Sequence, residues 1–308
     1  MSLLKRLEDG PPLLMDGAMG TELDRRGIKM DAKAWSASGL AGDATMIRAV
    51  HDDYIAAGAQ VHIVNSFALA RHVLEPAGLG DQVAALNRRA VEICRDALAA
   101  APDDRPQWIA GSLSTYAAQS DRSALPRGAT LVANFREQAE VLRDAGCDLF
   151  ALEMLCDVEI TLAMIEAVAP LGLPVMPGFT CIWGPDDRSV ETLAREVGLS
   201  PMSLEDALNG VLPKLPEGLP AILAIMHSDL DVSDPALEIA RAHWSGPLAV
   251  YPNSGRFAYP NWRFEEVCAP EAFVAAAERW TESGAILIGG CCGIGPAHIA
   301  ALGKTLAA

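Results

Sequence analysis

The sequence predicts a single-domain (β/α)8 barrel, or TIM barrel, that spans residues 1–308. Three observations predict this fold. Eight short apolar runs recur along the chain, helical patterns separate most of them, and no linker or shift of composition divides the sequence. Apolar residues make up 51% of the chain and charged residues 21%, which favours a folded core over disorder. The length of 308 residues is sufficient, because such a barrel takes about 250 residues.

The eight apolar runs are predicted to be parallel strands. Most of them are continuous rather than alternating, which is typical of strands buried on both faces. Pro177 is unusual in this setting, because proline cannot donate a hydrogen bond to a neighbouring strand. In chain order the predicted strands are residues 12–15, 59–64, 107–110, 148–152, 174–179, 221–226, 247–251 and 285–288.

The stretches between the strands are predicted to be helical. Three of them stop at Gly58, Gly146 and Gly284, and glycine is favoured just beyond the C-terminus of a helix. A doubly wound open sheet is the alternative fold, but the turn at residues 16–22 is a poor match to its Gly-x-Gly-x-x-Gly motif. The predicted helices are residues 44–57, 81–99, 131–145, 157–168, 234–242 and 270–283.

Polar residues follow the predicted strands, at the end of the barrel where this fold places its active sites. One polar loop residue would mean little, but two carboxylates, a histidine and two cysteines on the same rim indicate a functional site. The residues at these strand ends are Asp16, Asn65, Ser112, Glu153, Thr180, His227, Asn253, Cys291 and Cys292.

The adjacent Cys291 and Cys292 lie in a glycine-rich turn after the eighth strand. A disulfide between neighbouring cysteines strains the peptide between them, so we interpret the two thiols as ligands for Zn²⁺. A catalytic zinc site takes three protein ligands, and His227 after the sixth strand is the predicted third. The alternative for His227 is a hydrogen-bonding residue that only lines the pocket. The odd number of cysteines, seven, argues against a disulfide framework.

Charge and hydropathy limit the partners. The net charge of −16 repels phosphate backbones and anionic lipids, so we expect no nucleic acid and no membrane among the partners. No apolar run approaches the ~20 residues that span a bilayer, and residues 1–6 do not resemble a signal peptide, so the predicted compartment is the cytoplasm. The expected partners are small molecules, and the sequence is compatible with a homo-oligomer.

A series of motifs resembles the homocysteine S-methyltransferase family. Each motif alone is weak, but their order along nearly the whole chain makes the resemblance specific. The motifs are Leu14–Leu23, Trp35-Ser36-Ala37, His51–Ala59, Asn65-Ser66-Phe67, Ala110–Leu113, Asp148–Glu153, Tyr251–Gly255 and Gly289–Gly293.

The resemblance implies a zinc-dependent enzyme of methionine biosynthesis that methylates a small-molecule thiol. Zn²⁺ would hold homocysteine as a thiolate, which attacks the methyl group of a donor. Asp16 and Glu153 would bind the amino group of the substrate, although turn formation is the alternative role for Asp16. Asn65, Ser112 and Asn253 are the other expected substrate-binding residues.

The sequence also departs from the pattern of the family. The resemblance implies a third cysteine ligand where His227 stands, and tyrosines where Ala68 and Met154 stand; the missing tyrosines argue against betaine as the donor. A site with one thiolate fewer is less negative, so it holds the substrate sulfur more tightly and makes it less nucleophilic.

We therefore predict a zinc-dependent S-methyltransferase. It would move a methyl group from a small sulfonium donor, such as S-methylmethionine, to homocysteine or a related thiol. Two alternatives remain: a Cys₂His metal site that hydrolyses its substrate, and a non-catalytic barrel that binds an amino acid.

Overall fold

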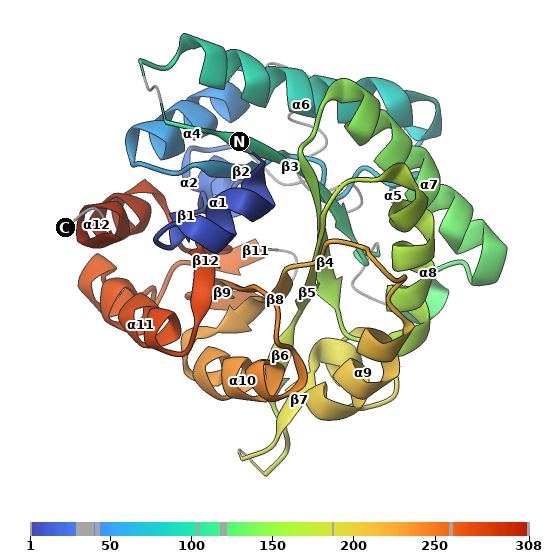
Figure 1. Cartoon of the computed structure of the whole chain (residues 1–308). Coiled ribbons are helices and arrows are strands. Elements are labelled where there is room, and N and C mark those ends of the chain that lie inside the picture. Colours follow the sequence, from blue (N-terminus) through green and yellow to red (C-terminus); the bar gives the residue numbers. More distant parts are fainter. Residues whose placement is uncertain are drawn as a thin grey trace.

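The eight predicted strands are all present in the computed structural model, where they form one parallel sheet. The structure describes residues 2–28, 40, 44–102, 105–117, 122–186, 188–258 and 261–306. The Trp35-Ser36-Ala37 motif lies outside these described residues. In Figure 1 the strands stand at the centre and the helices surround them, as the predicted (β/α)8 fold requires.

The strands pair in the order β1-β12-β9-β8-β5-β4-β3-β2. A parallel bridge between Met15 and Val61 joins the first strand to β2 and closes the barrel, which excludes the open-sheet alternative. Pro177 pairs with Leu152 inside its strand, so it does not interrupt the sheet. The barrel strands are β1 (Leu13–Leu14), β2 (Val61–Ile63), β3 (Trp108–Ser114), β4 (Leu149–Leu155), β5 (Val175–Phe179), β8 (Leu223–Asp229), β9 (Leu248–Asn253) and β12 (Ala285–Ile288).

Several strands continue further than the sequence predicts. Ser112, Glu153 and His227 lie within the last residues of β3, β4 and β8 rather than after them. The polar rim of the barrel is therefore built partly from the strands themselves, which hold side chains more rigidly than loops do.

All six predicted helices are present. They are α4 (Thr45–Ala56), α6 (Val83–Ala100), α7 (Gly128–Ala145), α8 (Val158–Val168), α10 (Leu230–His243) and α11 (Pro270–Glu282). The sequence prediction started α10 four residues too late, because Pro235 lies inside this helix. It missed α1 (Leu3–Asp9), α2 (Gly20–Arg25), α5 (Arg71–Leu74), α9 (Leu204–Val211) and α12 (Pro296–Leu306). Gly146 follows α7 with φ of 97°, the left-handed conformation expected after a helix.

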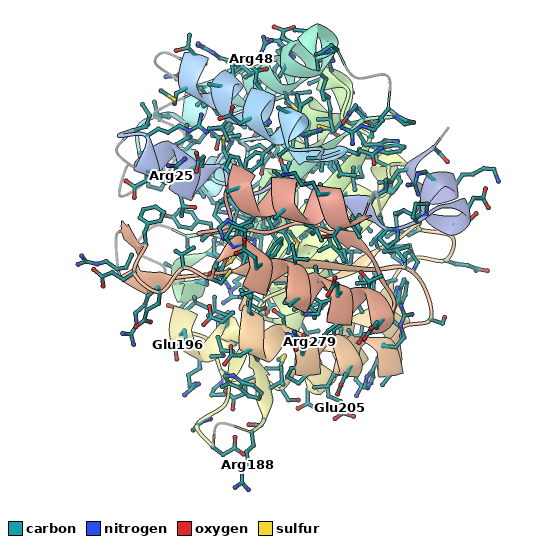
Figure 2. The ribbon with its side chains drawn as sticks, turned by 90° about the vertical axis from the view of Figure 1, so that its left-hand side faces the viewer. Arg25, Arg48, Arg188, Glu196, Glu205 and Arg279 are labelled. Carbon is teal, nitrogen blue, oxygen red and sulfur yellow. The ribbon has the colours of Figure 1, made fainter. Side chains whose placement is uncertain are left out.

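Two apolar layers hold the barrel together. One lies between the strands and the surrounding helices, and the other fills the inside of the barrel. Leu3 and Leu7 of α1 belong to the inner layer, so this helix closes the N-terminal end of the barrel. In Figure 2 α1 lies at one end of the molecule, while Arg25 of α2 and Glu196 lie toward the other.

Two antiparallel hairpins that the sequence analysis missed extend the sheet region. One is β6 (Cys181–Trp183) with β7 (Val190–Thr192), after β5, and the other is β10 (Arg256–Ala258) with β11 (Asn261–Arg263), after β9 (Figure 1). Both follow barrel strands at their C-terminal ends and so border the site. No helix within the described ranges combines the length and apolarity that crossing a membrane requires.

Candidate functional site

A cavity of about 440 Å³ opens at the C-terminal ends of the strands. Its volume lies within the range of about 300–1,000 Å³ that is common for small-molecule sites. Seven of the sequence-predicted site residues line it: Asn65, Ser112, Glu153, His227, Asn253, Cys291 and Cys292. Asp16 and Thr180 are buried and do not line the cavity, although Gly17 and Cys181 beside them do.

The cysteine turn is held by close packing and by backbone hydrogen bonds. A Cβ at Gly289 would lie 2.5 Å from Met15 Cβ, and one at Gly290 would lie 2.5 Å from Ile294, so only glycine fits at both positions. The amide of Cys291 donates to the carbonyl of Pro252 at 2.7 Å. The backbone therefore presents the two thiols to the cavity in a fixed arrangement.

The two sulfurs are spaced as ligands of one metal ion would be. Cys291 Sγ and Cys292 Sγ lie 3.9 Å apart, and two thiolates on a tetrahedral zinc, each at about 2.3 Å, would be about 3.8 Å apart. Hydrogen bonding to Cys292 raises the pKa of Cys291 most, and burial and the negative charge of Cys292 raise it further. A bound cation would reverse that shift and keep both as thiolates. The pair therefore fits a zinc ion.

Glu153 is the centre of a buried hydrogen-bond chain. The side chain is 3% exposed, and its Oε1 accepts a hydrogen bond from the hydroxyl of Ser112. Its Oε2 lies 2.8 Å from Nε2 of His227. The structure thus connects three predicted site residues from β3, β4 and β8 into one unit.

An unusual backbone conformation aims His227 at the cavity. Met154 and His227 have φ of 62° and 54°, values that cost a non-glycine residue roughly 1–2 kcal/mol. The pairing register shifts at the same places, between Leu152 and Leu155 and between Met226 and Asp229. Regular alternation would point His227 outward, because Met226 faces the barrel interior. The irregularity therefore turns the imidazole back into the site, as β-bulges near active sites do.

Asp16 lies one layer deeper than Glu153. Its Oδ2 accepts a hydrogen bond from the amide of Ile63 at 2.8 Å, and the hydroxyl of Tyr251 lies 3.2 Å from its Oδ1. Burial raises the pKa of Asp16, and the negative charge of Glu153 raises it further. Tyr251 was not predicted as a site residue, although it begins the Tyr251–Gly255 motif.

Asn253 connects two walls of the cavity. Its Nδ2 donates to the carbonyl of His227 at 2.9 Å, and its Oδ1 accepts from the amide of Cys292 at 3.1 Å. This arrangement makes Asn253 a positioning residue for the cysteine turn. Contact of Asn253, Asn65 or Ser112 with a substrate stays a prediction.

A second group of metal-ligand side chains lies behind the cavity wall. Among the described residues, the three side chains whose ligand atoms all lie within 4.8 Å of one another are Asp16, His51 and His62. Cys291, Cys292 and His227 do not form such a group. Asp16, His51 and His62 are all buried. His62 Nε2 lies 2.9 Å from Gln107 Oε1.

His51 is expected to make the protein acid-sensitive. Burial lowers its pKa to about 3 from the usual 6.5, and the nearby His62 and Arg48 lower it further. The unfolded chain therefore binds a proton below pH 6.5 that the folded chain does not bind. Stability is fully present above pH 6.5 and is lost as the pH falls toward 3. We expect the difference to be about 2 kcal/mol between pH 7 and pH 5.

The measurement is urea unfolding at both pH values. His51→Phe removes the titrating group and should lose about this much less stability on acidification than the parent protein. Ile55→Val, a conservative change in the same helix α4 that removes no titrating group, is the control and should keep the pH dependence of the parent. An unchanged pH dependence in His51→Phe would contradict the assignment.

The chain is similar to known proteins of one family. The family model of homocysteine S-methyltransferases matches residues 13–306. Homocysteine S-methyltransferase of Escherichia coli (strain K12) is 34% identical over 94% of this chain and 94% of its own length. Selenocysteine methyltransferase of Astragalus bisulcatus is 28% identical over 96% and 93%.

A solved structure agrees with these sequence matches. The metallated form of the homocysteine methyltransferase MmuM from Escherichia coli superposes with a TM-score of 0.79 at 30% identity, covering 98% of this chain and 99% of that one. The fold and the methyltransferase class predicted from the sequence are thereby confirmed. The chain belongs to the homocysteine S-methyltransferase family.

Proposed function

We propose that this protein transfers a methyl group from a small sulfonium donor, such as S-methylmethionine, to homocysteine or a related thiol. The observation that carries the proposal is the pair of sulfurs, 3.9 Å apart, in the same cavity as the buried carboxylate of Glu153. The sulfurs suit a thiol-binding metal, and the carboxylate suits the ammonium group of an amino acid. The relatives are named for homocysteine and selenocysteine, which supports an acceptor of this class.

Zn²⁺ is the metal that we propose for the cysteine pair. The spacing of Cys291 and Cys292 supports it, and the metallated form of the relative supports a bound metal ion. His227 Nε2 is bonded to Glu153, which leaves Nδ1 as the ring nitrogen for a metal, and histidine ligands commonly bond a carboxylate in this way. When bound, zinc would supply the charge that keeps the thiol of the acceptor ionised at neutral pH. The three ligand atoms are not all within 4.8 Å, so the ring of His227 would move toward the sulfurs.

The carboxylates would position the amino group of the acceptor. An ammonium beside Glu153 and Asp16 would offset their negative charge and favour ionisation of Asp16, whose pKa burial raises. Tyr251 and Ile63 hold Asp16 in place, and Ser112 and His227 hold Glu153. An acceptor held by its ammonium at the carboxylates and by its sulfur at the metal would be oriented for reaction.

Aromatic side chains would receive the donor. Phe67 and Tyr116 both line the cavity, with ring centroids 5.7 Å apart, and Phe67 lies 5.8 Å from the ring of His227. Aromatic faces attract cations such as a sulfonium. The acceptor sulfur forms a bond to the methyl carbon, the donor S–CH₃ bond breaks with its electrons remaining on the donor sulfur, and the thiol proton goes to water.

The test is an assay with zinc-loaded protein, unlabelled S-methylmethionine and homocysteine whose carbon chain carries ¹³C. We expect mass spectrometry to detect ¹³C-labelled methionine, which can form only from the acceptor, and labelled homocysteine to disappear at the same rate. Labelled methionine at no more than the level of the Cys291→Ala/Cys292→Ala variant would overturn this substrate pair. Metal-dependent hydrolysis that thiols inhibit would instead favour the hydrolase alternative.

A further inference from the structure

Arg122 is a buried cation in the wall of the cavity. It begins a short 3-10 turn, Arg122–Ala124, on the connection after β3, and it is 2% exposed. It nevertheless lines the cavity. Arginine is almost never fully buried unless a charged group pairs with it, so its partners are informative.

The partners of Arg122 are neutral. Nη1 donates to the carbonyl of Met154 at 3.1 Å and contacts the sulfur of Cys156 at 2.7 Å. Burial raises the pKa of Cys156 despite the neighbouring guanidinium, so the sulfur is a thiol at neutral pH. In the part of the chain that the structure describes, Arg122 makes no salt bridge with a carboxylate. Burial also lowers the pKa of Arg122, as expected for a cation without an anionic partner.

An isolated buried cation is unfavourable, because its hydration free energy is lost without compensation. An anion in the cavity would restore that energy. The planar guanidinium matches a carboxylate, which it can bind through two parallel hydrogen bonds. The contact with Met154 places Arg122 beside the residue that follows Glu153, so cationic and anionic groups adjoin in one cavity. Such an arrangement is complementary to a zwitterion.

We propose that Arg122 binds the carboxylate of an amino-acid substrate, so that this cavity selects substrates carrying both an ammonium and a carboxylate group. The carboxylate belongs either to the thiol acceptor or to the sulfonium donor, which share this chemistry. The proposal depends on the proposed function only for the identity of the ligand, because recognition of the carboxylate can be measured without turnover.

The first experiment is calorimetric binding of two probes to the zinc-loaded protein. L-Methionine carries the carboxylate, and 3-(methylthio)propylamine is the same molecule without it. We expect the parent protein to bind methionine at least 10-fold more tightly than the amine. Arg122→Gln should bind methionine 10- to 100-fold more weakly and the amine as before, and Arg122→Lys should lie between.

Arg188→Gln is the matched control, because Arg188 is exposed and lies outside the lining of the cavity. It should bind both probes as the parent does. Equal binding of the two probes by the parent protein would overturn the proposal even if the Arg122 variants do not fold. If a folded Arg122→Gln variant lost affinity for both probes equally, Arg122 would only support Met154 and Cys156, and the proposal would be wrong.

Steady-state kinetics then separate the two sources of the carboxylate. A raised KM for homocysteine alone in Arg122→Gln assigns the acceptor, and a raised KM for S-methylmethionine alone assigns the donor. An absence of turnover in the parent protein would remove the proposed function but leave the binding comparison intact. Unchanged binding and unchanged KM values for both substrates would overturn the role of Arg122.

Discussion

Replacing Cys291 or Cys292 by serine is expected to release the metal and to lower kcat/KM for methyl transfer by more than about 100-fold. Loss of a group that merely orients a metal ligand costs about 10- to 100-fold in metal affinity or activity, so loss of a ligand should cost more. Serine keeps the size of the side chain but is a poor ligand for zinc, which favours sulfur and nitrogen. The measurements are zinc content by elemental analysis and initial rates at fixed zinc.

Cys268→Ser is the control for the chemistry of the substitution. Cys268 is a partly buried cysteine outside the lining of the cavity, and its amide donates a hydrogen bond to the hydroxyl oxygen of Ser254 at 2.7 Å. This variant should keep zinc and activity. Full zinc content in Cys291→Ser/Cys292→Ser would contradict the proposed centre.

The buried group of Asp16, His51 and His62 gives this experiment a second outcome. If a metal binds there instead, His62→Ala should lose zinc while the cysteine variants retain it. We expect the reverse. The cysteine pair lines the cavity that a substrate can enter, whereas His51 and His62 are 0% exposed behind its wall.

The sequence predicts the barrel because its signals are local and repeated. The runs that form β4 and β9 are continuous and apolar, and Gly146 marks the end of α7 by the same rule that applies to any helix. The glycines before Cys291 also mark a turn in the sequence. The structure gives the reason, because the backbone at Gly289 lies too close to Met15 for a residue with a Cβ.

The sequence could not predict how the site residues face one another. Strand alternation alone points His227 away from the cavity, and only the positive φ and the register shift after Met226 turn it toward Glu153. Arg122 gave no signal either, because its position in the cavity wall depends on contacts with Met154 and Cys156, which are more than 30 residues away. Such tertiary contacts leave no periodic pattern.

Replacing Glu153 by glutamine is expected to lower kcat/KM for homocysteine by about 100- to 4,000-fold. Removing one partner of a buried charge pair costs about 3–5 kcal/mol, and each 1.4 kcal/mol is a factor of ten. Glutamine keeps the shape and can still bond to Ser112, but it offers no charge to an ammonium or to His227. The loss should appear mainly in KM for the acceptor, with KM for the donor little changed.

Glu191→Gln is the matched control. Glu191 lies in β7 outside the cavity lining, where its partner is Arg195 at 3.5 Å, so its neutralisation should leave both KM values unchanged. Parent-like kinetics in Glu153→Gln would show that the acceptor is not held by this carboxylate.

Two substitutions of His227 distinguish a metal ligand from a residue that only supports Glu153. His227→Gln can still donate a hydrogen bond to Glu153 but ligates zinc poorly, whereas His227→Cys can ligate zinc but donates weakly. If His227 is a ligand, the cysteine variant keeps zinc and the glutamine variant loses it. If His227 only supports Glu153, the zinc content is unchanged in both variants. The KM for homocysteine is then lower in His227→Gln than in His227→Cys. We expect the first pattern. His227 lines the same cavity as the two thiols, and its hydrogen bond to Glu153 through Nε2 leaves Nδ1 for the metal.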